Sequence, residues 1–230
     1  MTKNNKIIGG HLLADQLSTN GVDTIFCVPG ESYLGLMDGL YNHKDKIKLI
    51  TTRHESGAAN MADAYAKLTN KPGICLVSRG PGATNASNGV HTAYQDSTPL
   101  ILFIGQVSRN EREREAQQEI DYKEMFKPMA KYVAEINDAD RIPEFINKAF
   151  YISQSGRPGP VVLSLPEDML IDETISRTTP APNIFQSSPS KTAMDSFYEK
   201  LKKAKRPIII VGGNTWTKDA VNKLTQFVDD

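Results

Sequence analysis

The chain alternates short apolar strands with helices, and this rhythm limits the possible folds more than any other feature. Runs of aliphatic and β-branched residues recur at intervals of roughly 25 residues, with helical periodicity between them. Such alternation predicts parallel strands joined by right-handed crossovers, with helices on both faces of the sheet. We therefore predict an α/β fold with a parallel six-stranded sheet, its strands at residues 23–28, 47–52, 74–78, 100–105, 132–136 and 160–165.

The chain is expected to divide into three parts. Residues 1–170 hold the six strands, and residues 171–190 form a linker rich in proline, serine and threonine. Residues 191–230 contain a helix, a strand at 207–211 and a further helical stretch. Because a parallel strand needs parallel neighbours, we expect this last part to be the truncated start of a second α/β domain.

Composition narrows the class of protein and of partner. Lys plus Arg and Asp plus Glu number 27 each, so the net charge is zero and favours neither nucleic acid nor an anionic membrane as partner. No apolar run approaches the roughly 18 residues of a membrane span, and the start lacks a signal peptide core. Cys27 and Cys75 lie in predicted strands without metal-ligand or disulfide spacing. We expect reduced thiols, no histidine-built metal site and a cytoplasmic protein.

Glu55 stands where a predicted strand ends and a helix begins. The helical period starts near Gly57, so the Glu55 carboxylate is expected beside a helix N-terminus, which favours negative charge. In open parallel sheets, ligands bind in the crevice at the carboxyl ends of the strands. The local pattern leaves two interpretations open: Glu55 caps its helix, or it belongs to a ligand site.

A glycine-rich loop, SRGPGATN, follows the strand at 74–78 and opens another helix. Its position is that of a phosphate cradle at a helix N-terminus. The loop nevertheless matches neither G-x-G-x-x-G nor the Gly-Lys-Ser/Thr ending of a P-loop. The alternative, which the spacing favours, is that its glycines serve a tight turn and close backbone approach.

Four stretches together resemble one enzyme family: FCVPGESYLGLMDGL, RHESGAANMADAYAKLTNKPGICLVSRGPGATN, TAYQDSTPLILFIGQV and SGRPGPVVLSLPEDM. In this order they are similar to the N-terminal, pyrimidine-binding domain of thiamine diphosphate enzymes of the acetolactate synthase-like group. The resemblance covers residues 8–169, and the tail from Lys191 is similar to the start of that family's central domain. It implies a carboligase or decarboxylase of 2-keto acids, assembled as a homodimer or tetramer through this domain.

The resemblance also implies roles for individual residues. Glu55 would be the activating glutamate, which hydrogen-bonds a ring nitrogen of the aminopyrimidine and so promotes proton loss from the thiazolium carbon. Gln118 would be the second catalytic residue, with its amide near a substrate oxygen. The implied cofactor-binding positions are Pro29, Gly30, Glu55, Gly80, Pro81, Gly82, Thr84, Asn85 and Arg157.

Two further cofactors follow from the resemblance. In this family a Gly-Asp-Gly…Asn motif on a C-terminal domain holds the diphosphate and its magnesium, and no such motif occurs in these 230 residues. We therefore expect no Mg2+ ligands here and no turnover by this stretch alone. Arg157 matches an arginine that contacts FAD in the synthases, and a turn-stabilising arginine before a buried strand is the equal alternative.

Several positions depart from the synthases. Val28 stands where the synthases tend to have tyrosine, Glu31 and Ser32 stand where they have small residues, and Gln117 replaces an aromatic residue. These departures leave other reactions open, either an acyl-CoA decarboxylase or an aldehyde lyase of the same family. From a different class, the chain could be a non-catalytic cofactor-binding or assembly module.

Overall fold

A six-stranded parallel sheet forms the centre of the molecule and confirms the predicted α/β class. The computed structural model describes residues 6–185, 187–213 and 216–229. The strands run in the order β3-β2-β4-β5-β7-β6, and every neighbouring pair is parallel. Their bounds are β2 (Thr24–Cys27), β3 (Lys48–Thr51), β4 (Gly73–Val77), β5 (Leu100–Gln106), β6 (Tyr132–Glu135) and β7 (Pro160–Pro166).

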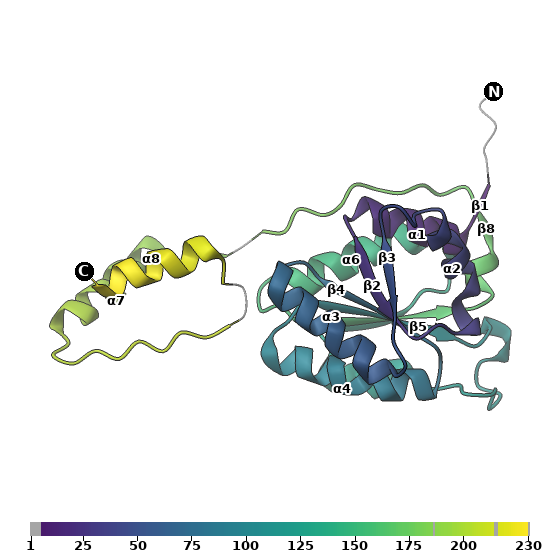
Figure 1. Cartoon of the computed structure of the whole chain (residues 1–230), viewed down its shortest axis with the longest axis horizontal. Coiled ribbons are helices and arrows are strands. Elements are labelled where there is room, and N and C mark those ends of the chain that lie inside the picture. The colour runs from purple at the N-terminus through teal and green to yellow at the C-terminus, as the bar shows by residue number, and fades with distance from the viewer. Residues whose placement is uncertain (1–5, 186, 214–215, 230) are drawn as a thin grey trace, which may run out of the picture.

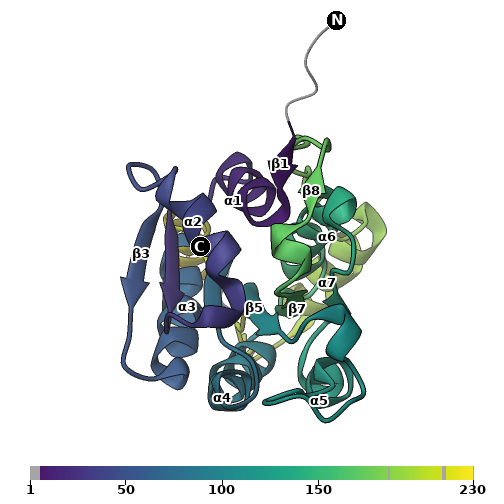
Figure 2. The ribbon, with the colours of Figure 1, turned by 90° about the vertical axis from the view of Figure 1, so that its right-hand side faces the viewer.

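Helices cover both faces of this sheet (Figures 1 and 2). One face packs against α1, α2 and α6, and the other against α3, α4 and α5. The bounds are α1 (Gly9–Thr19), α2 (Leu34–Tyr41), α3 (Glu55–Thr69), α4 (Pro81–Asp96), α5 (Tyr122–Phe126) and α6 (Ile142–Gln154). Short 3-10 helices occur at η1 (Glu31–Tyr33), η2 (Arg109–Glu111), η3 (Lys127–Met129), η4 (Ala139–Arg141) and η5 (Met169–Ile171).

The central strands are buried on both faces, which explains why they read as continuous apolar runs. Every residue of β4, β5 and β7 is buried. Cys27 and Cys75 are free and buried in β2 and β4, and burial raises the pKa of both thiols. Both thiols therefore stay protonated at neutral pH, as expected of core residues. None of the described helices is long and apolar enough to cross a membrane.

Helix α3 begins earlier than the sequence pattern predicts, and helix α4 begins inside the glycine-rich loop. The N-terminus of α3 lies at Glu55 rather than near Gly57, because the ring nitrogen Nδ1 of His54 accepts a hydrogen bond from the Ser56 amide at 3.2 Å. The N-terminus of α4 lies at Pro81, whose fixed φ suits the first helical position. Glu55 is therefore part of the first turn of α3.

The segment after β7 is attached to the sheet domain by strand pairing and by side-chain hydrogen bonds. β1 (Ile7–Ile8) pairs antiparallel with β8 (Glu173–Thr174). Further on, the Thr179 amide donates to Gln16 Oε1, and Gln16 Nε2 donates to the Thr179 carbonyl, both at 2.9 Å. Gln16 is fully buried and also donates to Asn147 Oδ1 at 3.2 Å. The first half of the predicted linker thus lies against α1 and α6.

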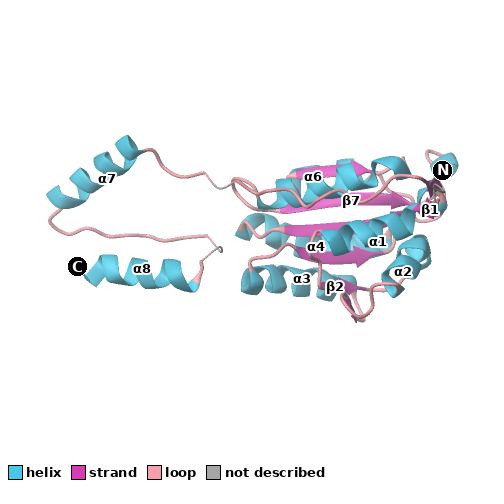
Figure 3. Cartoon of the chain, turned by 90° about the horizontal axis from the view of Figure 1, so that it is seen from above, coloured by secondary structure: helices cyan, strands magenta, loops and turns pink. Residues whose placement is uncertain are grey.

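The last part of the described chain forms two helices without a core. Neither α7 (Lys191–Lys203) nor α8 (Lys218–Asp229) contains a buried residue. The strand expected at residues 207–211 does not form, and these residues appear as loop in Figure 3. The reason is the absence of another strand among the described residues beyond β8, since a single strand cannot pair its backbone.

Replacing Gln16 by alanine should lower the free energy of unfolding by about 1–3 kcal/mol, because the fully buried Gln16 amide gives up its hydrogen bonds to Thr179 and Asn147. Urea denaturation measures this change. The control is Gln95→Ala, which removes an exposed amide on α4 and should change stability by less than about 0.5 kcal/mol. Equal, small changes in both variants would contradict the role assigned to Gln16.

Candidate functional site

Three segments singled out by the sequence follow adjacent strands. Pro29 and Gly30 follow β2, Glu55 follows β3, and the glycine loop around Gly80 follows β4. The chain leaves β2 for β3 on one side and then returns to place β4 on the other. The three segments therefore meet at a topological switch point, the position at which open α/β sheets bind ligands.

Glu55 presents one oriented and one available carboxylate oxygen. Asn85 Nδ2, from the first turns of α4, donates to Glu55 Oε2 at 3.0 Å. Within the described part of the chain, Oε1 makes no hydrogen bond, and a Cβ built on Gly82 would lie 3.6 Å from it. The partly buried carboxylate also lies at the N-terminus of α3, where negative charge is favoured. The sequence predicted this position of Glu55 but not its contact with Asn85.

The turn after β2 lies directly on the turn after β4. A Cβ built on Gly30 would be 2.7 Å from the Ser78 Cβ, so a larger residue cannot be accommodated without movement. The hydroxyls of Ser32 and Ser78 lie 2.9 Å apart. Beneath them, the buried Tyr33 hydroxyl donates to the Val28 carbonyl, and burial raises the pKa of Tyr33. Pro29 is exposed at the rim of this contact.

Gln118 is brought to the glycine loop from a distant part of the sequence. Gly80 has φ of +58°, and a Cβ there would lie 2.7 Å from the Gln118 Cβ and 3.0 Å from its carbonyl oxygen. The Gly80 amide donates to the buried Tyr122 hydroxyl at 2.8 Å. The exposed Gln118 side chain therefore stands beside the loop that contains Gly82 and precedes Asn85.

Other predicted positions have local roles. The Thr84 hydroxyl donates to the Pro81 carbonyl at 3.0 Å, within the first turn of α4, and both residues are exposed. Within the described residues, no group of three or more His, Cys, Asp or Glu side chains is arranged to hold a metal ion.

Arg157 lies away from these residues. Its Nε donates to Ser97 Oγ at 2.7 Å, and its Nη2 donates to the carbonyls of Tyr94 and Gln95 at 3.1 and 3.2 Å. These partners lie at the C-terminus of α4, a helix of 16 residues, and so about 24 Å from the glycine loop. A cation at this end satisfies the last carbonyls of the helix. A contact with FAD stays a prediction.

Arg79 is a functional candidate that the sequence pattern did not single out. Its Nη1 pairs with Glu167 Oε2 at 2.7 Å, and its Nη2 lies 3.8 Å from Glu31 Oε1. The guanidinium side chain is only 14 % exposed. The negative charge of Glu31 beside the turn is therefore partly offset. A basic residue inside the glycine loop was the available sequence signal.

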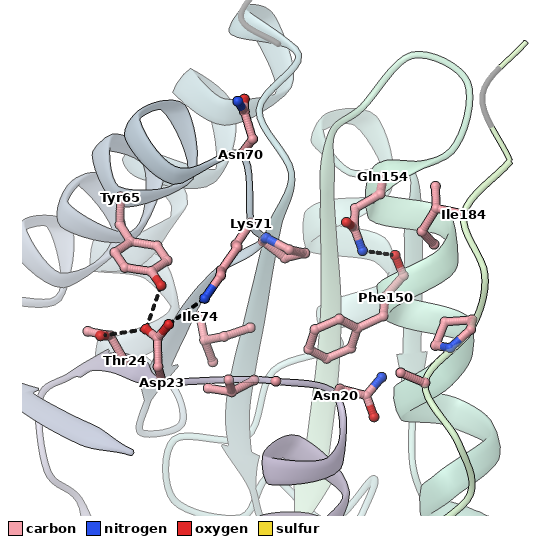
Figure 4. Close-up of a pocket in the computed structure, with 15 residues that line it drawn as sticks. Asn20, Asp23, Thr24, Tyr65, Asn70, Lys71, Ile74, Phe150, Gln154 and Ile184 are labelled. Carbon is pink, nitrogen blue, oxygen red and sulfur yellow. Dashed lines mark hydrogen bonds and ion pairs between the residues drawn. The ribbon is translucent and has the colours of Figure 1, made fainter. Parts of the chain in front are cut away.

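A cavity of about 350 Å³ lies at the opposite end of the strands, their amino ends (Figure 4). There the Asp23 carboxylate pairs with Lys71 at 2.6 Å and accepts from the Tyr65 hydroxyl at 2.5 Å. The cavity is lined by residues at the amino ends of β2 and β4, and Glu55 is not among them. It is separate from the candidate site.

A family model described as "Thiamine pyrophosphate enzyme, N-terminal TPP binding domain" matches residues 7–125. The chain belongs to this family. The match confirms the resemblance, and it covers the first three of the four sequence stretches, with Glu55, the glycine loop and Gln118. The chain also has relatives among acetolactate synthases.

The large subunit of acetolactate synthase from Lactococcus lactis subsp. lactis is 36 % identical over 225 residues, which are 96 % of this chain and 39 % of the relative. The corresponding subunit from Haemophilus influenzae is 35 % identical over 229 residues, 96 % of this chain and 40 % of the relative. The large subunit of isozyme 3 from Escherichia coli is 34 % identical over 235 residues, 96 % and 39 % of the two chains. The chain thus spans about two fifths of the length of these relatives.

Replacing Gly80 by alanine should destabilise the domain by more than about 1 kcal/mol, because the new Cβ meets Gln118 and φ is positive. The matched control is Gly57→Ala in the exposed first turn of α3, where nothing lies within 4 Å of the new Cβ. That change should be neutral or stabilise by about 0.5–1 kcal/mol. Urea denaturation of both variants checks the difference, and similar stabilities would refute the close contact.

Proposed function

We propose that this chain is the pyrimidine-binding part of a thiamine diphosphate-dependent carboligase or decarboxylase that acts on 2-keto acids. The family match and the names of the acetolactate synthase relatives support this function. The single observation that carries it is the Glu55 carboxylate at the switch point of the sheet, with one oxygen oriented by Asn85. A 2-keto acid such as pyruvate is the proposed substrate.

The surroundings of Glu55 fit one edge of an aminopyrimidine ring. Oε1 lies 3.6 Å from the Cβ position of Gly82, which carries no side chain, and the turns at Gly30 and Gly80 pack closely against Ser78 and Gln118 beside it. A flat heteroaromatic ring needs this close approach to backbone, and it needs one carboxyl group at hydrogen-bonding distance from a ring nitrogen. These features support the assignment of Pro29, Gly30, Gly80, Pro81, Gly82, Thr84 and Asn85 to the cofactor's surroundings.

The proposed mechanism gives Glu55 a proton-holding task. Thiamine diphosphate, when bound, would supply the carbon nucleophile for the keto group of the substrate. Asn85 donates to Oε2, which therefore acts as an acceptor. The proton that Glu55 shares with the ring nitrogen would then lie on Oε1, the oxygen next to Gly82. Partial burial of Glu55 limits competition from water for this hydrogen bond. Gln118, beside Gly80, would donate its amide to a substrate oxygen.

The other parts of the proposal concern cofactors and assembly. Magnesium would accompany the diphosphate and be held by residues outside this chain. FAD binding through Arg157 is the less supported part, because the hydrogen bonds of Arg157 to α4 already account for its position. We further propose a cytoplasmic homodimer or tetramer assembled through this domain, and the two buried, protonated thiols are consistent with a reducing compartment.

One observation favours a different branch of the family. The Glu31–Arg79–Glu167 cluster places charges directly beside the turn that faces the proposed pyrimidine site. Such a charge pattern would alter which substrate is accepted, as between a carboligase and an aldehyde lyase or an acyl-CoA decarboxylase. The proton-holding role proposed for Glu55 is common to these branches, whereas the product that is formed distinguishes them.

Changing Glu55 to glutamine in the complete gene product should reduce turnover by about 10²–10⁴-fold, because the variant keeps its size but loses the positioned acid. Pyruvate is the first substrate, with acetolactate formation measured against aldehyde release. Thermal unfolding and thiamine diphosphate affinity should change far less than turnover.

The matched control is Glu124→Gln, at an exposed position of α5, which should leave turnover unchanged. Near-normal turnover in the Glu55 variant would overturn the proposed function. If pyruvate is not consumed but the Glu55 effect appears with another donor, the chemistry of the site stands and the substrate assignment fails.

A further inference from the structure

The loop that carries Gln118 has an unusual backbone. In residues 112–121, three non-glycine residues have positive φ: Glu113 at 61°, Glu115 at 55° and Gln118 at 66°. Each such residue is disfavoured by sterics, and conformations of this kind persist only where the surroundings enforce them. Some interaction in this loop must therefore hold the backbone in place.

Glu119, the residue after Gln118, supplies that interaction. Its Oε1 accepts hydrogen bonds from Arg112 Nη1 at 3.0 Å and from the Glu113 amide at 2.8 Å. Its Oε2 accepts from the Ala116 amide at 3.3 Å, and its own amide donates to the Ala116 carbonyl at 3.0 Å. The Glu119 side chain is only 13 % exposed. One carboxylate thus closes the loop around the strained residues.

The closed loop is anchored to the carboxyl ends of two strands. Arg112 Nη2 lies 3.7 Å from Oε2 of Glu135, the last residue of β6. The fully buried Gln106, the last residue of β5, donates its Nε2 to the Ile120 carbonyl at 3.0 Å. These contacts fix where the loop stands relative to the sheet, on either side of Gln118.

We propose that Glu119 is a positioning residue, which holds residues 112–121 so that Gln118 lies against Gly80 at the reacting centre. The inference rests on the proposed function only for the role of Gln118. The alternative is that Glu119 contributes to stability alone and does not act through Gln118. If Glu119 acts through Gln118, substitutions at the two residues have dependent effects on kcat/KM. If Glu119 contributes to stability alone, their effects on kcat/KM are independent.

A double-mutant cycle on the complete gene product tests this dependence. Glu119→Ala should lower kcat/KM by up to about 10²-fold, the loss that a misplacement of about 1 Å can cause. In a Gln118→Ala background the same change should have almost no further effect, because the residue that it positions is already gone. Effects that multiply would overturn the proposal. Glu119→Gln, which keeps one acceptor oxygen, should fall between wild type and Glu119→Ala.

A second measurement does not depend on turnover. Hydrogen exchange of residues 112–121 should become at least 10-fold faster in Glu119→Ala, because the Glu113 and Ala116 amides lose their acceptor, and should increase less in Glu119→Gln, which keeps one of the two oxygens. The matched control is Glu111→Ala, an exposed residue just before the loop, which should leave exchange and kcat/KM unchanged. Unchanged exchange in both Glu119 variants would overturn the inference. Failure of the proposed function would instead appear as normal turnover in Glu55→Gln, whatever the loop does.

Discussion

Parallel pairing of β2 with β3 on one side and β4 on the other is the constraint on which the candidate site depends. Strand order alone brings together the turn at Gly30, the first turn of α3 and the glycine loop, although they belong to three successive β-α units. The connections that follow β2 and β3 run in opposite directions, so no crossover covers the place where these three segments meet. Glu55 gains a partner from α4 because α3 and α4 lie side by side on one face.

The glycines at this site are required because they have no side chain, which lets neighbouring segments pack closely. A side chain on Gly30 would collide with Ser78, and one on Gly80 would collide with Gln118. The positive φ of Gly80 adds a conformational reason for glycine. Of the two interpretations of the glycine loop, close backbone approach therefore explains its glycines, and no phosphate is needed to account for them.

Near the same site, charged side chains are paired and strained backbone is held by hydrogen bonds from nearby residues. Arg79 offsets Glu31 and Glu167, so the rim carries paired rather than isolated charges. The strained backbone of the Gln118 loop is held by the Glu119 carboxylate, each of whose oxygens accepts a hydrogen bond from a backbone amide. Farther along, α7 and α8 expose apolar side chains such as Phe197 and Phe227, because no described element packs against them.

The sequence by itself determined the class of fold, the six strands and the placement of Glu55 between a strand and a helix, because periodicity and turn residues are local properties. Together with four motifs, it also identified the family. Only the tertiary structure decided that Asn85 orients Glu55, that Gln118 reaches Gly80, and that Arg157 lies at the far end of α4. These contacts join residues far apart in the sequence, and they depend on strand order and loop path, which no local pattern encodes. The expected strand at residues 207–211 failed for the same reason, since an apolar run becomes a strand only where a neighbour can pair with it.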